Sequence, residues 1–170
     1  MRDRRRGGGV SIFCFSSILS RGLPLLTVSD LTIESCAIEI TSDGTLMVLL
    51  AIYWPHSDTI DDFNVKLLVL LHDFVKVEHV VILRKLNMNI LNVSCPYVNS
   101  NEMILRSLHF LPMITKPTRF PSGLMTGTSL DHAWTNKFGG SLAGILCMDI
   151  FGSMSYNFVP KINTIFIWKI

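Results

Sequence analysis

Charged residues are scarce in this chain. Asp, Glu, Lys and Arg together make up 16% of the residues, against roughly 25% in ordinary soluble domains, and the mean hydropathy of +0.42 suggests a membrane protein. The longest uninterrupted apolar run, however, is residues 46–54, about half of the roughly 20 residues that a helix needs to cross a bilayer. The apolar runs are therefore predicted to be buried strands, and no membrane partner is expected.

A strong charge of either sign is also lacking. The formal net charge is +2, which is too small to indicate a nucleic-acid-binding protein by itself. The basic cluster formed by Arg2 and residues 4–6 precedes a run of glycines. Short charged termini are commonly disordered, so residues 1–9 are predicted to be a flexible start.

Paired cysteine motifs are missing as well. Cys14, Cys36, Cys95 and Cys147 form no C-x-x-C pair and no zinc-like spacing with the histidines, which argues against a metal cluster or a disulfide scaffold. The start MRDRRR and the later VSIFCFSSIL follow the charge order of a signal peptide, but an A-x-A-like cleavage site is lacking. We therefore expect reduced thiols and an intracellular location, nuclear or cytoplasmic.

Hydrophobic patterning predicts strands that alternate with two helices. Apolar residues recur at helical spacing over residues 60–74, with Ser57 or Asp58 as the N-cap. A weaker helix is predicted over residues 101–108. By length and β-branched content, strands are predicted at residues 10–15, 33–40, 46–54, 80–87, 129–135, 142–150 and 164–168. Since no linker or repeat interrupts them, residues 1–170 are expected to form one domain.

Both predicted helices depart from ordinary design. Val65, Val69 and Val75 lie on the outward face of the first helix, where charged residues are usual. Either a protein partner covers this face, or its sequence has drifted away from the charged residues usual on a solvated helix face. His109 and Phe110 follow the second helix, at the place where glycine most easily adopts the positive φ of a helix end.

Motifs along the chain point to one known family. They are ITKPTR at residues 114–119, the set Ser129, Asp131, His132, Thr135 and Asn136, GGGVSIF at 7–13, IESCAIEI at 33–40, IYWP at 52–55 and LRKLNMNIL at 83–91. In this order they resemble the endonuclease domain of LINE-type, jockey-like non-LTR retrotransposons, a branch of the endonuclease/exonuclease/phosphatase superfamily. The resemblance extends from residue 7 to about residue 150.

The resemblance implies a fold and a chemistry. The implied fold is α/β, a two-sheet β-sandwich flanked by helices, and the family's strands before GGGV are missing from this sequence. The implied activity is Mg²⁺-dependent hydrolysis of a DNA phosphodiester, in which carboxylates hold a hard cation against the phosphate. Tyr53, Asn87 and Asp131 stand at catalytic positions of the family, and Asp131 is also the candidate metal ligand.

Other positions of the family's site carry different residues here. Lys85 and Arg84 replace an Asp and a Gly, and Gly152 and Ser153 stand where an Asp-His pair is expected. A lysine at the position of a metal ligand places like charge beside the cation, which weakens the electrostatics that hydrolysis needs. The sequence therefore predicts a catalytically inactive remnant that binds no Mg²⁺.

Two alternatives to an inactive remnant remain open. One is an endonuclease that keeps weak activity. The other is a domesticated protein- or nucleic-acid-binding domain, whose cations contact DNA phosphates without reading the bases. The candidate cations are Arg84, Lys85, Lys116 and Arg119. In each case Tyr53, Asn87 and Asp131 are expected to lie together at one end of the sandwich, with Lys85 close enough to Asp131 for a salt bridge.

Overall fold

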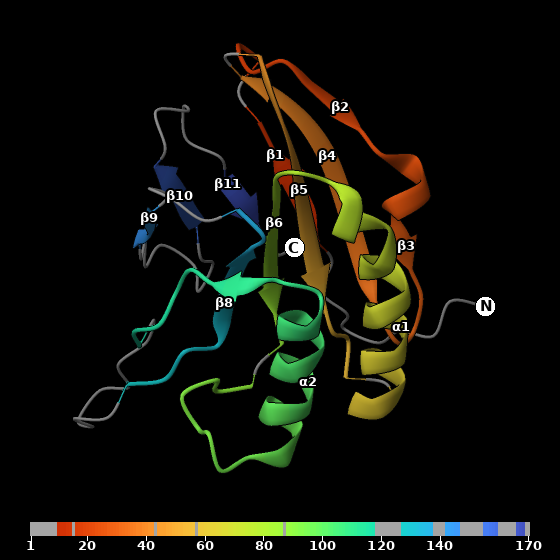
Figure 1. Ribbon diagram of the computed structural model, residues 1–170, viewed down its shortest axis with the longest axis vertical. Helices are drawn as coiled ribbons and strands as arrows, with labels where there is room; N and C mark the ends of the chain where they lie inside the picture. Colours follow the sequence, from red (N-terminus) through yellow and green to blue (C-terminus); the bar gives the residue numbers. More distant parts are fainter. Residues whose placement is uncertain are drawn as a thin grey trace.

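The computed structural model describes residues 10–14, 16–42, 44–56, 58–86, 88–117 and 127–137, together with the strands at 142–146, 155–159 and 166–168. A mixed sheet carries two helices on one face, and the last strands of the chain lie beside the sheet (Figure 1). The segment predicted to be flexible, residues 1–9, lies outside the described residues.

A seven-stranded mixed sheet is the centre of the fold. Its spatial order is β2-β4-β5-β6-β8-β7, and β3 also pairs with β4. The β5–β6 pair is parallel, so the chain has to cross over between these two strands, and it does so through helix α1. The strands are β2 (Ser20–Gly22), β3 (Val28–Ser29), β4 (Glu34–Ser42), β5 (Thr45–Tyr53), β6 (Val80–Lys85), β7 (Leu111–Pro112) and β8 (Asp131–Thr135).

The apolar run predicted to be a buried strand is β5. Residues 47–53 of β5 are buried, because both faces of the sheet are covered there by other layers. This confirms the prediction of a strand over residues 46–54. A tight turn at Gly44, which has φ 73°, joins β5 to β4, and this positive φ favours glycine.

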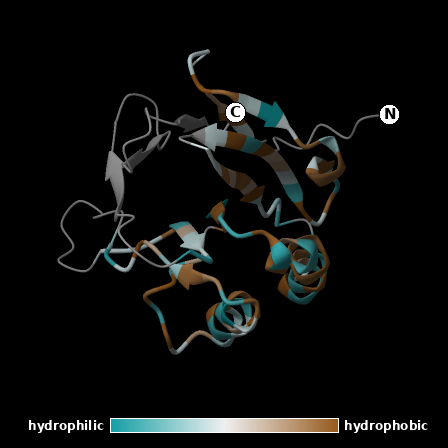
Figure 2. Ribbon diagram, turned by 45° about the horizontal axis from the view of Figure 1, so that its top comes forward, coloured by the Kyte–Doolittle hydropathy of each residue, from teal (hydrophilic) through white to brown (hydrophobic). Residues whose placement is uncertain are grey.

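Each face of the large sheet packs against its own hydrophobic cluster. On the helix side, Leu50, Ile82 and Trp134 pack with side chains of both helices. On the opposite side, Leu49 and Val81 pack with Ile12 of β1 (Ser11–Phe13). The two helices lie on the same side of the sheet, as Figure 2 shows.

Two antiparallel strand pairs complete the structure. β1 pairs with β11 (Phe166–Trp168), and β9 (Leu142–Leu146) pairs with β10 (Ser155–Val159). The predicted fold class, an α/β β-sandwich with helices outside, is confirmed. The short strands β2, β3, β7 and β10 were not predicted, because two to five residues without clear alternation give little signal.

Helix α1 spans Ile60–His72 and continues as the 3-10 helix η2 (Asp73–Lys76). Its N-cap is Thr59, whose hydroxyl accepts a hydrogen bond from the backbone N–H of Asp62 at 3.2 Å. The predicted N-cap at Ser57 or Asp58 is therefore wrong. The carboxylate of Asp58 instead accepts a hydrogen bond from the hydroxyl of Thr32.

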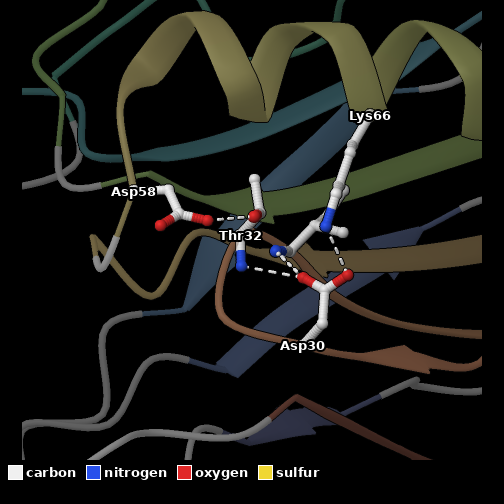
Figure 3. A network of polar contacts seen from close by, with 5 residues as sticks. Asp30, Thr32, Asp58 and Lys66 are labelled. Atoms are coloured by element: carbon white, nitrogen blue, oxygen red, sulfur yellow. Dashed lines mark hydrogen bonds and ion pairs between the residues drawn. The ribbon is translucent and has the colours of Figure 1, made fainter.

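The loop before β4 is tied to α1 by polar contacts (Figure 3). The carboxylate of Asp30 accepts hydrogen bonds from the backbone N–H groups of Thr32 and Ile33 at 2.7 and 2.8 Å. Its other oxygen forms an ion pair with the Lys66 ammonium at 2.6 Å. These contacts fix the start of β4, and with it the position of Glu34.

Helix α2 spans Pro96–Ser107 and starts five residues before the predicted start at residue 101. Pro96 at the first helical turn is the missed signal, since proline has a φ suited to this position. The C-terminus is a Schellman motif: the N–H of Phe110 donates to Leu105 O at 2.9 Å and that of His109 donates to Arg106 O at 3.0 Å. His109 takes the left-handed position with φ 64°. Within the described part of the chain, no helix is long and apolar enough to cross a membrane.

Candidate functional site

Four polar side chains lie in register across the large sheet. Glu34 on β4 pairs with Tyr53 on β5, Tyr53 pairs with Lys85 on β6, and Lys85 pairs with Asp131 on β8. Directly paired residues project from the same face of a sheet. We call Glu34, Tyr53, Lys85 and Asp131 the transverse row.

The transverse row faces away from the helices. Side chains alternate between the two faces along a strand, and Val81 and Leu83 of β6 belong to the cluster on the side opposite the helices. Lys85 follows in the same alternation, as does Asp131 next to Ala133 of that cluster. The row therefore closes one end of the layer between the large sheet and β1.

Tyr53 and Asp131 were predicted to share a site, and they are on strands separated by β6 alone. Asp131 is 1% exposed. Lys85 lies directly opposite Asp131, and the Cβ atoms of such a pair are about 5 Å apart. The two side chains therefore project from the same face of the sheet, and the predicted salt bridge between them stays a prediction. Asn87, Gly152 and Ser153 lie outside the described residues, so their predicted places in the site stay predictions.

Glu34 is the member of the row that the sequence did not predict. Its place follows from the β4–β5 hairpin, in which Ser42 pairs with Thr45 across the turn and Glu34 consequently pairs with Tyr53. The Asp-Gly pair at residues 43–44 is a strong hairpin signal. Counting back from that turn could have placed Glu34 beside Tyr53.

Arg84 was predicted to contact DNA phosphates, and this prediction is wrong. Its side chain faces the helices and is 2% exposed, because it alternates with Lys85 and so points to the helix side of β6. One terminal nitrogen, Nη1, donates to the side-chain oxygen of Asn101, which in turn donates through Nδ2 to Asn64 at 2.7 Å. Burial lowers the pKa of Arg84 to about 9.

The buried guanidinium of Arg84 is held by a neutral network and by an aromatic ring. Its central carbon lies 5.2 Å from the ring centre of Trp134, and that of Arg106 lies 5.8 Å from the same ring. Within the described part of the chain, Nε and Nη2 of Arg84 have no hydrogen-bond partner. Arg84 is therefore a buried structural cation. Of the other predicted phosphate contacts, Lys116 is exposed and Arg119 lies outside the described residues.

The residues around Asp131 that match the family motif have structural roles. The side chain of Asn136 accepts from the N–H of Val80 and donates to the carbonyl oxygen of Val77, both at 2.7 Å, so it holds the start of β6. Ser129 accepts from the N–H of Ile90 through its carbonyl oxygen at 3.1 Å. These bonds connect the ends of β8 to the segment that precedes β6 in the sequence and to the segment that follows it.

His132 belongs to the same structural set. Its Nε2 lies 3.1 Å from Met88 O and 3.3 Å from Ser129 O. Both partners are carbonyl oxygens, so Nε2 carries the proton and donates. Burial, together with the charge of Arg84, lowers the pKa of His132 to about 3. A histidine that stays neutral at physiological pH cannot supply an imidazolium to a reaction there.

The described residues do not fit the magnesium ion that the family resemblance implies. Among them, no group of three or more His, Cys, Asp or Glu side chains could hold a metal ion. The two carboxylates of the transverse row are on strands three spacings apart, roughly 14 Å at the usual distance between strands. Lys85 stands between them in the row, so a positively charged residue separates the two carboxylates.

A cleft of about 590 Å³ opens between the N-terminal ends of α1 and α2. Its wall includes Trp54, Asp58, Asp61 and Tyr97. His56, which has φ 60° and stacks on Trp54 with ring centres 3.9 Å apart, lies at its edge. The acidic side chains of this cleft oppose the binding of a phosphate backbone.

Comparison with known proteins gives a likeness in structure alone. No protein-family model matches the chain, and no curated protein is significantly similar to it. The endonuclease domain of TRAS1, a telomere-specific non-LTR retrotransposon, has a TM-score of 0.57 and 11% sequence identity, over 98% of this chain and 81% of that one.

Weaker structural likenesses cover about half of the matched proteins. An endonuclease/exonuclease/phosphatase family protein from Leptotrichia buccalis has a TM-score of 0.46 and 13% sequence identity. The match covers 66% of this chain and 46% of the Leptotrichia chain. Beta toxin from Staphylococcus aureus, with bound magnesium ions, has a TM-score of 0.46 and 12% sequence identity. The match covers 79% of this chain and 53% of the toxin chain. From the TRAS1 likeness and the sheet and helices described above, the protein has the fold of the TRAS1 endonuclease domain.

Proposed function

We propose that the protein is a catalytically inactive derivative of a retrotransposon endonuclease, whose ancestral reaction was Mg²⁺-dependent nicking of DNA. The observation that carries the proposal is the position of Lys85, between Tyr53 and Asp131 in the transverse row. The shared fold supports the ancestry and says nothing about present activity.

Lys85 opposes the electrostatics of phosphodiester hydrolysis. The reaction needs a hard cation that neutralises charge developing on the phosphate oxygens. At about 4 Å and an effective dielectric constant near 20, two like unit charges repel by about 4 kcal/mol, so a divalent ion next to Lys85 meets about twice that. With a lysine paired directly opposite it, Asp131 attracts a metal less than an isolated carboxylate would.

A plasmid-nicking assay tests the proposal. With Mg²⁺ and supercoiled plasmid, the purified protein is expected to produce no nicked circles above a protein-free blank. The TRAS1 endonuclease domain, assayed alongside, serves as the positive control. Nicking by the unmodified protein that EDTA abolishes and Asp131→Ala removes would show that the domain is an active endonuclease.

Binding of DNA without catalysis is the weaker candidate. Of the four cations predicted to contact phosphates, Arg84 is buried, and Lys85 lies beside a buried carboxylate that competes with phosphate for its charge. Lys116 is exposed. Arg119 lies outside the described residues. Among the three described cations of this set, one exposed lysine supplies only a small share of the many phosphate contacts on which affinity for DNA depends.

A further inference from the structure

The outward side of α1 carries a continuous apolar stripe. Val65 and Val69 are 64% and 70% exposed, and Leu68 between them and Val75 in η2 are exposed as well. Residues three and four apart share one face of a helix, so these side chains adjoin each other. The opposite side of α1 buries Ile60, Phe63, Asn64, Leu67 and Leu71. Single exposed apolar residues are common, whereas a contiguous patch indicates an interaction surface.

Charged residues stand at both ends of the apolar stripe. Asp61 precedes the stripe in the first turn of α1, and Lys76 follows it at the end of η2. Both side chains are exposed. His72 lies on the same side near the C-terminal end, and Asp73 is 3.5 Å from its ring. The stripe thus has Asp61 at its start, apolar side chains in its middle and Lys76 at its end, where Asp73 of η2 also carries a negative charge.

We propose that this face of α1 binds the same face of a second copy of the chain, with the two helices antiparallel about a two-fold axis near Leu68 and Val69. Asp61 and Lys76 are equally far from this centre along the sequence. In the antiparallel arrangement Asp61 of each copy therefore lies opposite Lys76 of the partner subunit. Leu68 lies opposite Val69 of the partner subunit at the axis.

The charge pattern is what favours a second copy as the occupant. A two-fold interface brings one patch against itself, so the patch must be self-complementary. A stripe with opposite charges at equal distances from its centre meets this condition when the helices are antiparallel, and the two helix dipoles then oppose each other favourably. A parallel arrangement would place Asp61 against Asp61 and Lys76 against Lys76.

The expected dimer is weak. One helix face on each copy gives an interface at the small end of the size range of specific complexes. We therefore expect half-dissociation at a concentration on the order of 10–100 µM. Sedimentation velocity on the full chain over a concentration series is expected to show a shift from monomer to dimer. A sedimentation coefficient that stays at the monomer value throughout the series would overturn the proposal.

Substitution at the centre of the stripe tests the location of the interface. Leu68→Glu places like charges at the two-fold axis and is expected to weaken association at least about tenfold, since a like-charge contact costs several kcal/mol. Leu19→Glu is the matched control, because Leu19 is exposed but precedes β2, and it is expected to leave association unchanged. Circular dichroism melting of both variants verifies that they fold. Association that survives in Leu68→Glu would overturn the assignment to α1.

Charge exchange tests the antiparallel geometry. Asp61→Lys alone and Lys76→Asp alone each bring like charges together at both ends of the interface, so each is expected to remain monomeric where the unmodified protein dimerises. An equimolar mixture of the two variants pairs lysines with aspartates at both ends and is expected to form a heterodimer. The double variant is expected to regain self-association. A mixture that stays monomeric while both single variants fold would refute the proposed pairing.

Discussion

At the residue scale, the family motifs separate into positions that hold the fold and positions that perform chemistry. Asn136 and His132 match the family, and in the structure they bond backbone groups of neighbouring segments. Lys85, which by the resemblance replaces an aspartate of the family's site, pairs with Asp131 between β6 and β8. Substitution of a residue that hydrogen-bonds several segments lowers the stability of the fold. A residue that only binds a metal can be substituted without loss of folding.

A change at Lys85 alone is expected to restore affinity for a cation. Lys85→Asp puts a carboxylate directly opposite Asp131, with Tyr53 next to it on the other side. We expect Tb³⁺, a probe of oxygen-ligand cation sites, to bind this variant at least about tenfold more tightly than the unmodified protein, because a repulsion of several kcal/mol is replaced by attraction. Luminescence of Tb³⁺ excited through tyrosine measures the binding.

Two further variants control the terbium experiment. Lys85→Met removes the positive charge without adding a ligand and is expected to bind Tb³⁺ only slightly better than the unmodified protein. Lys85→Asp combined with Asp131→Asn should lose most of the gain. Equal Tb³⁺ affinity in Lys85→Asp and Lys85→Met would contradict the view that position 85 decides cation binding in this row.

At the element scale, the sequence predicts what depends on neighbouring residues and fails where distant segments decide. The periodicity of residues 60–74 correctly predicts α1, because its buried side chains recur every three or four positions. The N-cap was predicted at the wrong residue, because Asp58 binds Thr32 from a different part of the chain. The start of α2 was placed five residues too late, although Pro96 is a local signal.

The C-terminus of α2 carries a strained residue. His109 occupies the left-handed position of the Schellman motif with φ 64°, a conformation that glycine adopts without a steric penalty. His109→Gly is expected to raise the free energy of unfolding by about 1 kcal/mol, and the melting temperature by about 2–4 °C for a chain of this size. The His109 side chain is exposed, so its loss removes little packing.

A matched variant separates the backbone effect from the loss of the side chain. His109→Ala removes the imidazole but keeps a Cβ atom in the left-handed position, so it is expected to bring no gain in stability. Urea unfolding of the three proteins gives the comparison. Equal stabilisation by alanine and glycine would mean that the imidazole, and not the backbone angle, carries the penalty.

At the scale of the whole molecule, the order of motifs along the chain predicts the sandwich correctly but leaves the site half defined. Most of the motifs fall on strands, such as IESCAIEI on β4, whereas ITKPTR at residues 114–119 lies after β7 and on no described strand. Which side chains meet across strands depends on register, and Glu34 was missed because its partner is set by a turn ten residues away. The error at Arg84 came from treating a cation as exposed, although alternation with Ile82 puts it under the helices.

The buried pair of Arg84 and His132 is expected to make the stability of the whole molecule fall in acid. In the folded chain the pKa of His132 is about 3, whereas an unfolded histidine titrates near 6.5. Between these two values the unfolded state binds a proton that the folded state does not bind. The contribution of His132 to stability is therefore fully present above about pH 6.5 and is lost as the pH falls toward 3.

Urea unfolding at pH 6.5 and 4.5 measures this loss, with the fluorescence of buried Trp134 contributing to the signal. The contribution of His132 to the free energy of unfolding is expected to decrease by about 2 kcal/mol between the two pH values. This is somewhat less than the largest decrease possible when the unfolded state binds one more proton than the folded state over the whole interval. His132→Gln keeps an N–H donor for the carbonyl oxygens of Met88 and Ser129 and has no group that titrates. The variant is expected to be less stable than the unmodified protein at pH 6.5 and to lose about 2 kcal/mol less on acidification. If both proteins lose the same amount, the acid sensitivity of the fold arises from its carboxylates, and the neutral, buried state assigned to His132 is wrong.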